Sequence, residues 1–137
     1  MSPRRSFPQP EQSAGKGIAM AGYGSVLVYE DNPLVLMDAE ETLYRRGFAR
    51  VLTARSEPVA LSMARDEMLQ FALVSAFTTD ADGACVADQL AARGVPFAFS
   101  CDFADGSDRP ERWHKVPFLV RPYTESDVSG LLAQFGL

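Results

Sequence analysis

The chain has 137 residues, of which 47% are hydrophobic and 23% charged, so it is long enough to form one domain with a substantial core. No apolar run approaches the length that crosses a membrane, and the net charge is −5. Because residues 1–24 hold three basic side chains and one acidic one, the remainder carries −7, which disfavours nucleic acid as a partner.

Residues 1–24 are rich in Pro, Ser, Gln and Gly and have no aliphatic pattern. This composition predicts a disordered or loosely ordered tail before a domain at 25–137. The segment PRRSF resembles the start of a twin-arginine export signal, but no apolar stretch follows it. We therefore expect a cytoplasmic protein, and Met20 is an alternative start that the sequence leaves open.

The first half of the domain is predicted to form two strand–helix pairs. A buried strand is expected at 25–30, and the helix after it lies within 31–47. The residues at roughly helical spacing in that helix are Leu34, Val35, Met37 or Asp38, Leu43 and Tyr44. A second strand at 49–54 leads into a helix at 56–67, which Ser56 is expected to cap.

The second half continues the alternation. Three further strands are expected at 70–75, 95–101 and 116–122. Helices are expected at 83–94 and 124–137, the latter with Thr124 and Asp127 in capping-box positions. Strands alternating with helices at this spacing predict right-handed crossovers and a parallel sheet.

One helix is missing from the alternation. The segment DFADGSDRPERWHK, residues 102–115, contains Gly106 and Pro110, both of which oppose helix propagation. We expect the fourth helix to be short or replaced by a loop.

Candidate functional residues lie at the strand ends, since open parallel sheets form their functional crevice at the carboxyl edge. The side chains there are Glu30, Asp31, Ser75, Cys101 and Arg121. Cys85 and Cys101 lack the spacing of a zinc site, and His114, the only histidine, has no plausible nucleophile beside it. An enzyme or flavin-binding protein is disfavoured, because no glycine-rich phosphate loop follows the first strand.

The strand ends resemble the receiver domains of two-component response regulators, and the resemblance covers residues 25–135. In that family an acidic pair after the first strand binds Mg²⁺, and Glu30 and Asp31 match it. The phosphoacceptor Asp of the family ends the third strand, eight residues before a Gly. Counting back from Gly83 gives Ser75 at that position.

The later strands extend the resemblance. The family ends its fourth strand on Thr or Ser, where Cys101 stands here. It ends its fifth strand on Lys-Pro-Phe/Tyr, which here reads Arg121-Pro122-Tyr123, with Phe118 at the position of an aromatic switch residue. The stretch ARGVPFAFSCDF also resembles the Pro-Phe-x-Phe-Ala-Thr-Gly-Tyr signature of alphaproteobacterial single-domain receivers. The implied fold is a doubly wound, flavodoxin-like α/β domain whose five-stranded parallel sheet has the order 2-1-3-4-5.

Three reactive positions depart from the family. A serine hydroxyl is a weak nucleophile without a base, and the thiol of Cys101 is a poor hydrogen-bond donor. With the acceptor carboxylate replaced by Ser75, we expect the Mg²⁺ site at Glu30 and Asp31 to be weak or lost. We also expect Arg121 to form an ion pair with one of those two acids.

The resemblance and its departures predict a stand-alone degenerate receiver, not an enzyme, that signals through protein contacts. The partner is expected to be a histidine kinase, a phosphotransferase protein or another signalling protein, with an oligomer also compatible with the sequence. We expect the contact surface to be the fifth strand, the last helix and the loop before that strand, with Trp113 and Tyr123 as contact residues. The alternative is a phosphorelay receiver that is still phosphorylated, with Mg²⁺, on Ser75 or on a nearby acid such as Asp80 or Asp82.

Overall fold

The computed structural model describes residues 23–76 and 82–137, apart from the side chains of residues 23 and 82–85. Most of the predicted tail, residues 1–22, and the segment 77–81 lie outside the described residues, and so does the predicted acceptor Asp80. The backbone of Asp82 begins a helix, but its side chain also lies outside the description.

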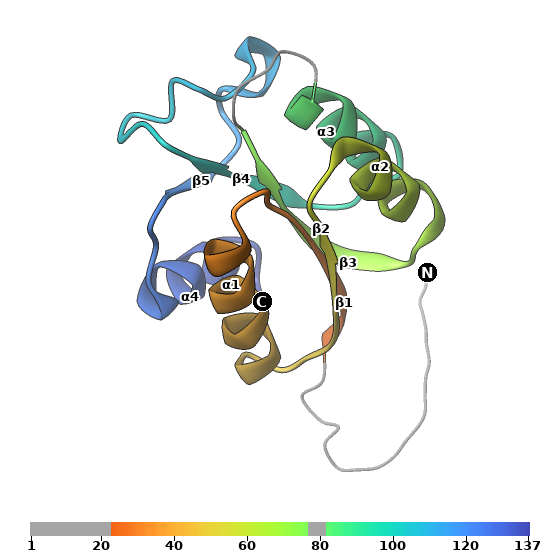
Figure 1. Cartoon of the computed structure of the whole chain (residues 1–137), viewed down its shortest axis with the longest axis vertical. Helices are drawn as coiled ribbons and strands as arrows, with labels where there is room; N and C mark the ends of the chain where they lie inside the picture. Colours follow the sequence, from red (N-terminus) through yellow and green to blue (C-terminus); the bar gives the residue numbers. More distant parts are fainter. Residues whose placement is uncertain (1–22, 77–81) are drawn as a thin grey trace.

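Five strands form one parallel sheet in the order β2-β1-β3-β4-β5, which confirms the predicted doubly wound, flavodoxin-like topology (Figure 1). They are β1 Tyr23–Tyr29, β2 Phe48–Ala54, β3 Leu69–Ser75, β4 Phe97–Cys101 and β5 Phe118–Val120. The first strand begins at Tyr23 instead of Ser25. Tyr23 is in register with Phe48, and the Gly24 N–H donates to Gln70 Oε1 at 2.6 Å.

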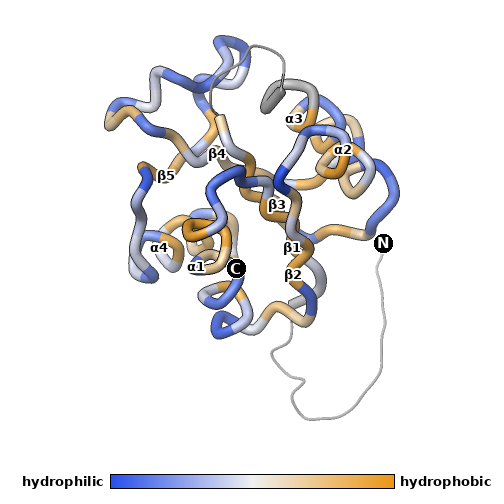
Figure 2. Tube along the Cα trace, viewed as in Figure 1, coloured by the Kyte–Doolittle hydropathy of each residue, from blue (hydrophilic) through white to orange (hydrophobic). Residues whose placement is uncertain are grey.

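In the described part of the chain, four helices cover the sheet, two on each face (Figure 1). They are α1 Pro33–Arg45, α2 Glu57–Asp66, α3 Asp82–Ala92 and α4 Glu125–Gln134. Helices α1 and α4 lie on one face, and α2 and α3 lie on the other. The apolar strand residues are sandwiched between these layers, while polar residues dominate the surrounding loops (Figure 2).

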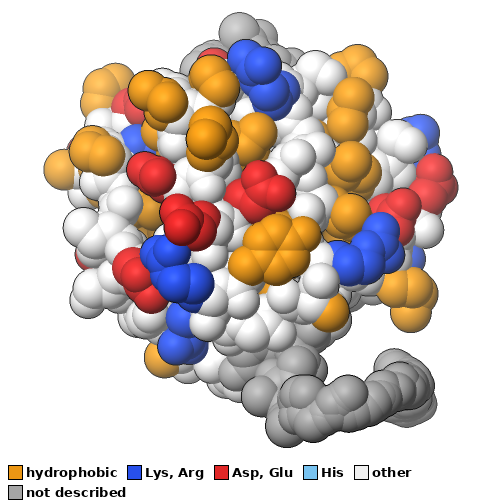
Figure 3. All heavy atoms as spheres, turned by 60° about the horizontal axis from the view of Figure 1, so that its bottom comes forward, with side chains coloured by type: hydrophobic (Ala, Val, Ile, Leu, Met, Phe, Trp, Pro, Cys, Tyr) orange, Lys and Arg blue, Asp and Glu red, His pale blue; other side chains and the backbone are white. Residues whose placement is uncertain are grey.

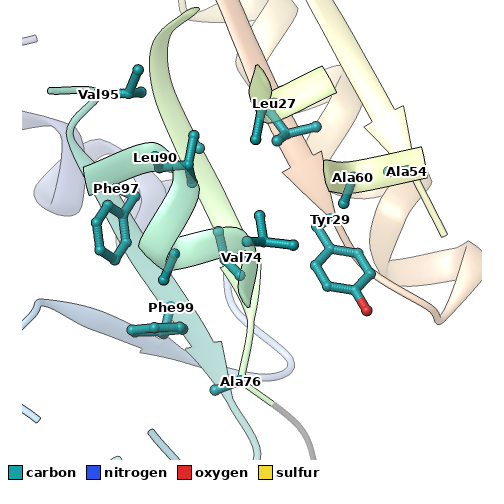
Figure 4. Close-up of a cluster of buried hydrophobic side chains, with 14 of the residues drawn as sticks. Leu27, Tyr29, Ala54, Ala60, Val74, Ala76, Leu90, Val95, Phe97 and Phe99 are labelled. Carbon is teal, nitrogen blue, oxygen red and sulfur yellow. The ribbon is translucent and has the colours of Figure 1, made fainter. Parts of the chain in front are cut away.

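Alternation along the strands divides the core into two clusters, because successive strand residues point to opposite faces. Beneath α2 and α3, the cluster includes Leu27, Val74, Phe97 and Phe99 (Figure 4). Beneath α1 and α4, the cluster includes the neighbouring positions Val26, Val28, Leu73 and Ala98. All five residues of β4 are buried, so this strand is enclosed on both faces.

Local capping explains where two of the helices begin. Asn32 Oδ1 accepts hydrogen bonds from the backbone N–H groups of Leu34 and Val35, at 2.9 and 3.3 Å. Thr124 and Asp127 form the predicted capping box at the start of α4. Ser56 occupies the N-cap position of α2, but its side chain makes no capping hydrogen bond.

Between β4 and β5 the chain forms a loop with one short 3-10 helix, Glu111–Trp113, which confirms that a regular fourth helix is absent here. The Trp113 ring packs edge-on against Phe97 at a centroid distance of 5.3 Å, and its Nε1–H donates to Asp88 of α3 at 3.3 Å. Arg112 adds a two-pronged ion pair to the same Asp88. The loop is thereby attached to α3.

Candidate functional site

Polar side chains meet at the carboxyl edge of the sheet, on the face that α1 and α4 cover. Glu30 follows β1, Ser75 ends β3, and Ser100 lies in β4 in register with Ser75. All three residues are about 1% exposed. Arg121 directly follows β5 and reaches all three. The fold therefore brings together the first, third and fifth strand ends, as the sequence predicted.

Arg121 is the centre of this cluster. Its Nη1 lies 2.8 Å from Glu30 Oε1 and 3.0 Å from Ser75 Oγ. The same nitrogen is 3.4 Å from Ser100 Oγ. Its Nε donates to Asp102 Oδ1 at 3.0 Å. The predicted ion pair is thus present with Glu30 rather than Asp31, and Asp102 is a second carboxylate partner that the sequence did not indicate.

The Arg121–Glu30 pair is buried, with side chains 10% and 2% exposed. Burial raises the pKa of Glu30, while the Asn32 N–H, 3.0 Å from Oε2, and the Arg121 guanidinium both act to lower it. Burial lowers the pKa of Arg121, but its bonds to Glu30 and Asp102 outweigh that effect, so the pKa is raised. The guanidinium is consequently a fixed positive charge in the crevice.

Ser100, not Cys101, points its side chain into the cluster. Cys101 is fully buried on the opposite face of the sheet, in the cluster that contains Phe99. Burial raises the pKa of its thiol to about 12, and the neighbouring Asp108 carboxylate adds to the shift. The family signature favoured Cys101, whereas strand alternation from Ser75 through its partner Ser100 identifies the hydroxyl on the correct face. A switch role for Cys101 stays a prediction.

A cleft of about 640 Å³ opens above the cluster. Its lining consists of Glu30, Asp31, Asn32, Val35, Asp102, Arg121 and Pro122. Asp31 is exposed at its rim, and Asp102 is 61% exposed. Within the described part of the chain, no three His, Cys, Asp or Glu side chains are grouped so as to hold a metal ion.

The residues present do not fit a tightly held Mg²⁺. Mg²⁺ requires several hard oxygen ligands in near-octahedral geometry. Here Glu30 already binds a permanent cation, and Ser75 offers a neutral oxygen to which Arg121 donates. A divalent ion would therefore have to compete with a guanidinium for the buried carboxylate of Glu30.

The predicted switch residue Phe118 is half-buried and closely enclosed. The Arg109 guanidinium lies 4.4 Å above its ring centroid and also donates to the Gly106 carbonyl at 2.9 Å. Gly106 has φ +70°, and a Cβ added there would lie 2.8 Å from the Phe118 ring. The ring is therefore confined by the loop that replaces the fourth helix.

The two predicted contact residues are largely used inside the molecule. Trp113 is half-buried against Phe97, as described above. Tyr123 packs against the α1–α4 core cluster, and its buried hydroxyl has no hydrogen-bond partner among the described residues. Burial raises the pKa of this phenol, and the negative charge of Glu30 raises it further. Their proposed role at a partner surface stays a prediction.

No protein-family model matches the chain, and no curated protein matches it. Several solved structures are similar to it. The BeF3-activated conformation of SdrG from Pseudomonas melonis Fr1 is 28% identical over 86% of this chain and 100% of that chain, with a TM-score of 0.70. A CheY-like receiver domain from Methylobacillus flagellatus is 18% identical over 83% of this chain and 98% of that chain, with a TM-score of 0.68.

A response regulator receiver protein from Sinorhizobium medicae gives a similar result, with 20% identity over 84% of this chain and 94% of that chain and a TM-score of 0.66. None of the described helices is long and apolar enough to cross a membrane. The parallel sheet and its strand order agree with those of these structural neighbours. The chain has the fold of the CheY-like receiver domains of response regulators.

Proposed function

We propose that this chain is a degenerate receiver that acts in two-component signal transduction through protein–protein contacts, not through its own phosphorylation. The fold of its structural neighbours supports a receiver. The observation that carries the degenerate part is the Arg121 cluster. The Arg121 guanidinium is hydrogen-bonded to both Glu30 and Ser75, which by resemblance match a Mg²⁺ ligand and the acceptor of an ordinary receiver, and this supports the proposal.

The chemistry of Ser75 supports this proposal. Its hydroxyl would need a positioned base to attack a phosphoryl donor. The nearest buried carboxylate, Glu30, is bound by Arg121. His114, the only histidine, is exposed in the β4–β5 loop, with its Nδ1 2.6 Å from the Glu111 carbonyl oxygen. Neither group is arranged to activate Ser75.

The partners that suit such a protein are the signalling proteins that receivers meet: a histidine kinase, a phosphotransferase protein or another regulator. A receiver that resembles its relatives in fold but does not accept phosphate can bind such proteins without turning over their phosphoryl groups. Mg²⁺ binding, if retained at Glu30 and Asp31, is weak under this proposal. We propose no catalytic activity for the chain.

The test is intact-mass spectrometry after incubation with acetyl phosphate and Mg²⁺, with an ordinary receiver treated in parallel as a control for donor activity. We expect the control to gain one phosphoryl group and this chain to stay unmodified. A phosphoryl group mapped to Ser75, Asp80 or Asp82 would overturn the proposal. It would instead support the alternative, a receiver that still takes part in a phosphorelay.

A further inference from the structure

Strand β2 leaves one edge of the sheet open. It is the outermost strand beside β1, and in the described part of the chain no strand pairs with the other side of its seven residues. The Ala54 carbonyl accepts a hydrogen bond from the Glu30 N–H at 2.9 Å, so Ala54 and every second residue before it bond to β1. The backbone N–H and C=O groups of Ala49, Val51 and Thr53 therefore point away from the sheet. We call these three residues the β2 edge.

A contact with α1 agrees with this direction. The Val51 N–H donates to the Tyr44 hydroxyl at 3.3 Å, a long hydrogen bond to a side chain that is 47% exposed. Ala49 is exposed and Thr53 is half-buried, so solvent reaches both. A row of outward backbone groups is a template on which a further strand can pair.

The segment around β2 is basic, although the chain as a whole is acidic. Residues 45–56 contain four arginines and no acidic residue, whereas the net charge of the chain is −5. Arg45 and Arg50 are paired with acidic side chains from other parts of the fold or of the same helix. On the face shown in Figure 3, basic and acidic side chains lie next to one another in the same way.

The two remaining arginines flank the strand without such partners. Arg46 precedes β2 and Arg55 follows it, and no carboxylate of the described residues forms an ion pair with either. Arg46 Nε is buried with no hydrogen-bond partner among those residues, and Arg55 Nη2 reaches the Asp31 carbonyl only at 3.5 Å. Between them, Arg50 is 59% exposed and 3.5 Å from Glu67, a contact that contributes little energy. Positive charge therefore lies at both ends and in the middle of β2.

We infer that the β2 edge binds, by strand addition, an extended acidic segment of a partner protein. The backbone of that segment would pair with the outward groups of β2, and its Asp or Glu side chains would meet Arg46, Arg50 and Arg55. A second copy of this chain is a poor occupant, because two β2 edges paired with each other would bring the arginines of both copies together. The inference goes beyond the proposed function, since no residue of the β2 edge belongs to the Arg121 cluster.

The probe is a short synthetic peptide of alternating Thr and Val with Glu at its centre and at both ends, titrated into the isotopically labelled full chain and followed by NMR. We expect amide shifts centred on β2, slower hydrogen exchange at Ala49 and Thr53, and an affinity that falls as salt is added. A matching peptide with Lys in place of Glu should bind far more weakly. The acidic peptide with N-methyl groups along its pairing edge should also lose binding, because it cannot donate hydrogen bonds to β2.

Charge variants of the chain test the electrostatic part. Arg50→Gln/Arg55→Gln should weaken binding by about tenfold or more and reduce its salt dependence. Arg112→Gln/Lys115→Gln is the matched control. It removes the same charge from exposed side chains of the β4–β5 loop, so binding should not change. Circular dichroism of each variant should match that of the parent chain.

Two backbone variants test the pairing itself. Tyr44→Phe removes the hydroxyl that occupies the Val51 N–H, so binding should strengthen by about two- to tenfold, the value of one hydrogen bond. Ala49→Pro removes an outward N–H at an edge position, where a strand tolerates proline, and should weaken binding.

Several outcomes would overturn the inference: no shifts with the acidic peptide, equal binding of the Lys or N-methyl peptide, or shifts centred on α1 or on the β4–β5 loop. Tighter binding of a single-stranded oligonucleotide at β2 would assign the arginines to nucleic acid and also overturn it. Dilution-dependent shifts of β2 in the free chain would assign the edge to a second copy. The phosphodonor experiment is independent of these, because phosphorylation would refute the proposed function and leave peptide binding at β2 standing.

Discussion

The two faces of the sheet differ sharply at the carboxyl edge. On the side of α2 and α3, the strand ends Tyr29, Val74 and Cys101 continue the apolar core to the edge. On the side of α1 and α4, the same strands end in Glu30, Ser75 and Ser100, all buried and all bonded to or near Arg121. The carboxyl edge of the sheet therefore carries a polar cluster on one face only. It is held by electrostatic pairing, whereas the opposite face is held by packing.

The largest effect should come from breaking the pairing. Arg121→Met leaves the Glu30 carboxylate buried without its cation, which should cost about 3–5 kcal/mol of unfolding free energy at pH 7. Urea unfolding measures this. The matched control is Arg50→Met, which breaks the exposed Arg50–Glu67 pair and should cost less than about 1 kcal/mol.

A double variant separates the charge from the packing. In Arg121→Met/Glu30→Leu both charges are absent, so no carboxylate is stranded, and much of the loss should be recovered. If the double variant were as unstable as Arg121→Met alone, the stability of the cluster would come from the packing of these side chains and not from their ion pair.

The pH dependence should distinguish the two faces as well. A folded-state pKa of Glu30 above its ordinary value of 4.5 means that the folded chain binds more protons. The contribution of Glu30 to stability is therefore full at low pH and is lost as pH rises through the raised pKa. Loss of Arg121 raises that pKa further, so the deficit of Arg121→Met should widen as the pH rises above the ordinary Glu pKa of 4.5.

The control for pH dependence lies on the apolar face. Phe99→Ala removes a fully buried ring and should cost about 3–5 kcal/mol. No titratable group is created or stranded by that change. Its deficit should stay level over the same pH range, and a parallel pH dependence in both variants would contradict the assignment to Glu30.

A smaller effect is expected where the loop meets the sheet. Gly106→Ala places a methyl group 2.8 Å from the Phe118 ring at a positive φ, which should cost about 1–3 kcal/mol. Gly130→Ala is the matched control: it lies in α4 with nothing within 4 Å of an added Cβ. That change should stabilise the chain by about 0.5–1 kcal/mol, because alanine favours a helix more than glycine does. Thermal unfolding compares the two.

Much of this fold could be predicted from the sequence, because its local signals agree. Apolar runs, helix starts and the break at Gly106 and Pro110 gave every strand and helix in the described part to within a few residues. The Arg121–Glu30 pair was also predictable, since parallel strands end at one edge and a lone cation there meets an acid. These inferences depend on chain order and sheet topology alone.

The remainder depended on which way side chains point. A step of one residue along a strand reverses the face, so a motif comparison that selected Cys101 passed over Ser100. Leu34, Met37 and Leu43 lie at roughly helical spacing, but only Leu43 of the three is buried, together with Leu36. Trp113 was expected at a contact surface, yet in the fold its ring packs against Phe97.

The result most informative for function should come from Ser75→Asp. Arg121 Nη1 lies 3.0 Å from Ser75 Oγ, so the guanidinium already stands where a new carboxylate would need a counter-charge. The like charges of Glu30 and Asp31 oppose the change, and Arg121 offsets part of that repulsion. We expect a net loss smaller than the loss from Arg121→Met when unfolding is measured without metal.

The same geometry limits what Ser75→Asp can restore. The added oxygen ligand beside Glu30 and Asp31 should let Mg²⁺ raise the melting temperature, which the parent chain should not show. Phosphoryl transfer from acetyl phosphate should be slow, because Arg121 holds both Glu30 and the new carboxylate. Adding Arg121→Lys replaces the planar fork with a single mobile charge and should speed labelling. If intact-mass spectrometry showed fast labelling of the Ser75→Asp variant alone, Arg121 would not be the residue that slows phosphoryl transfer.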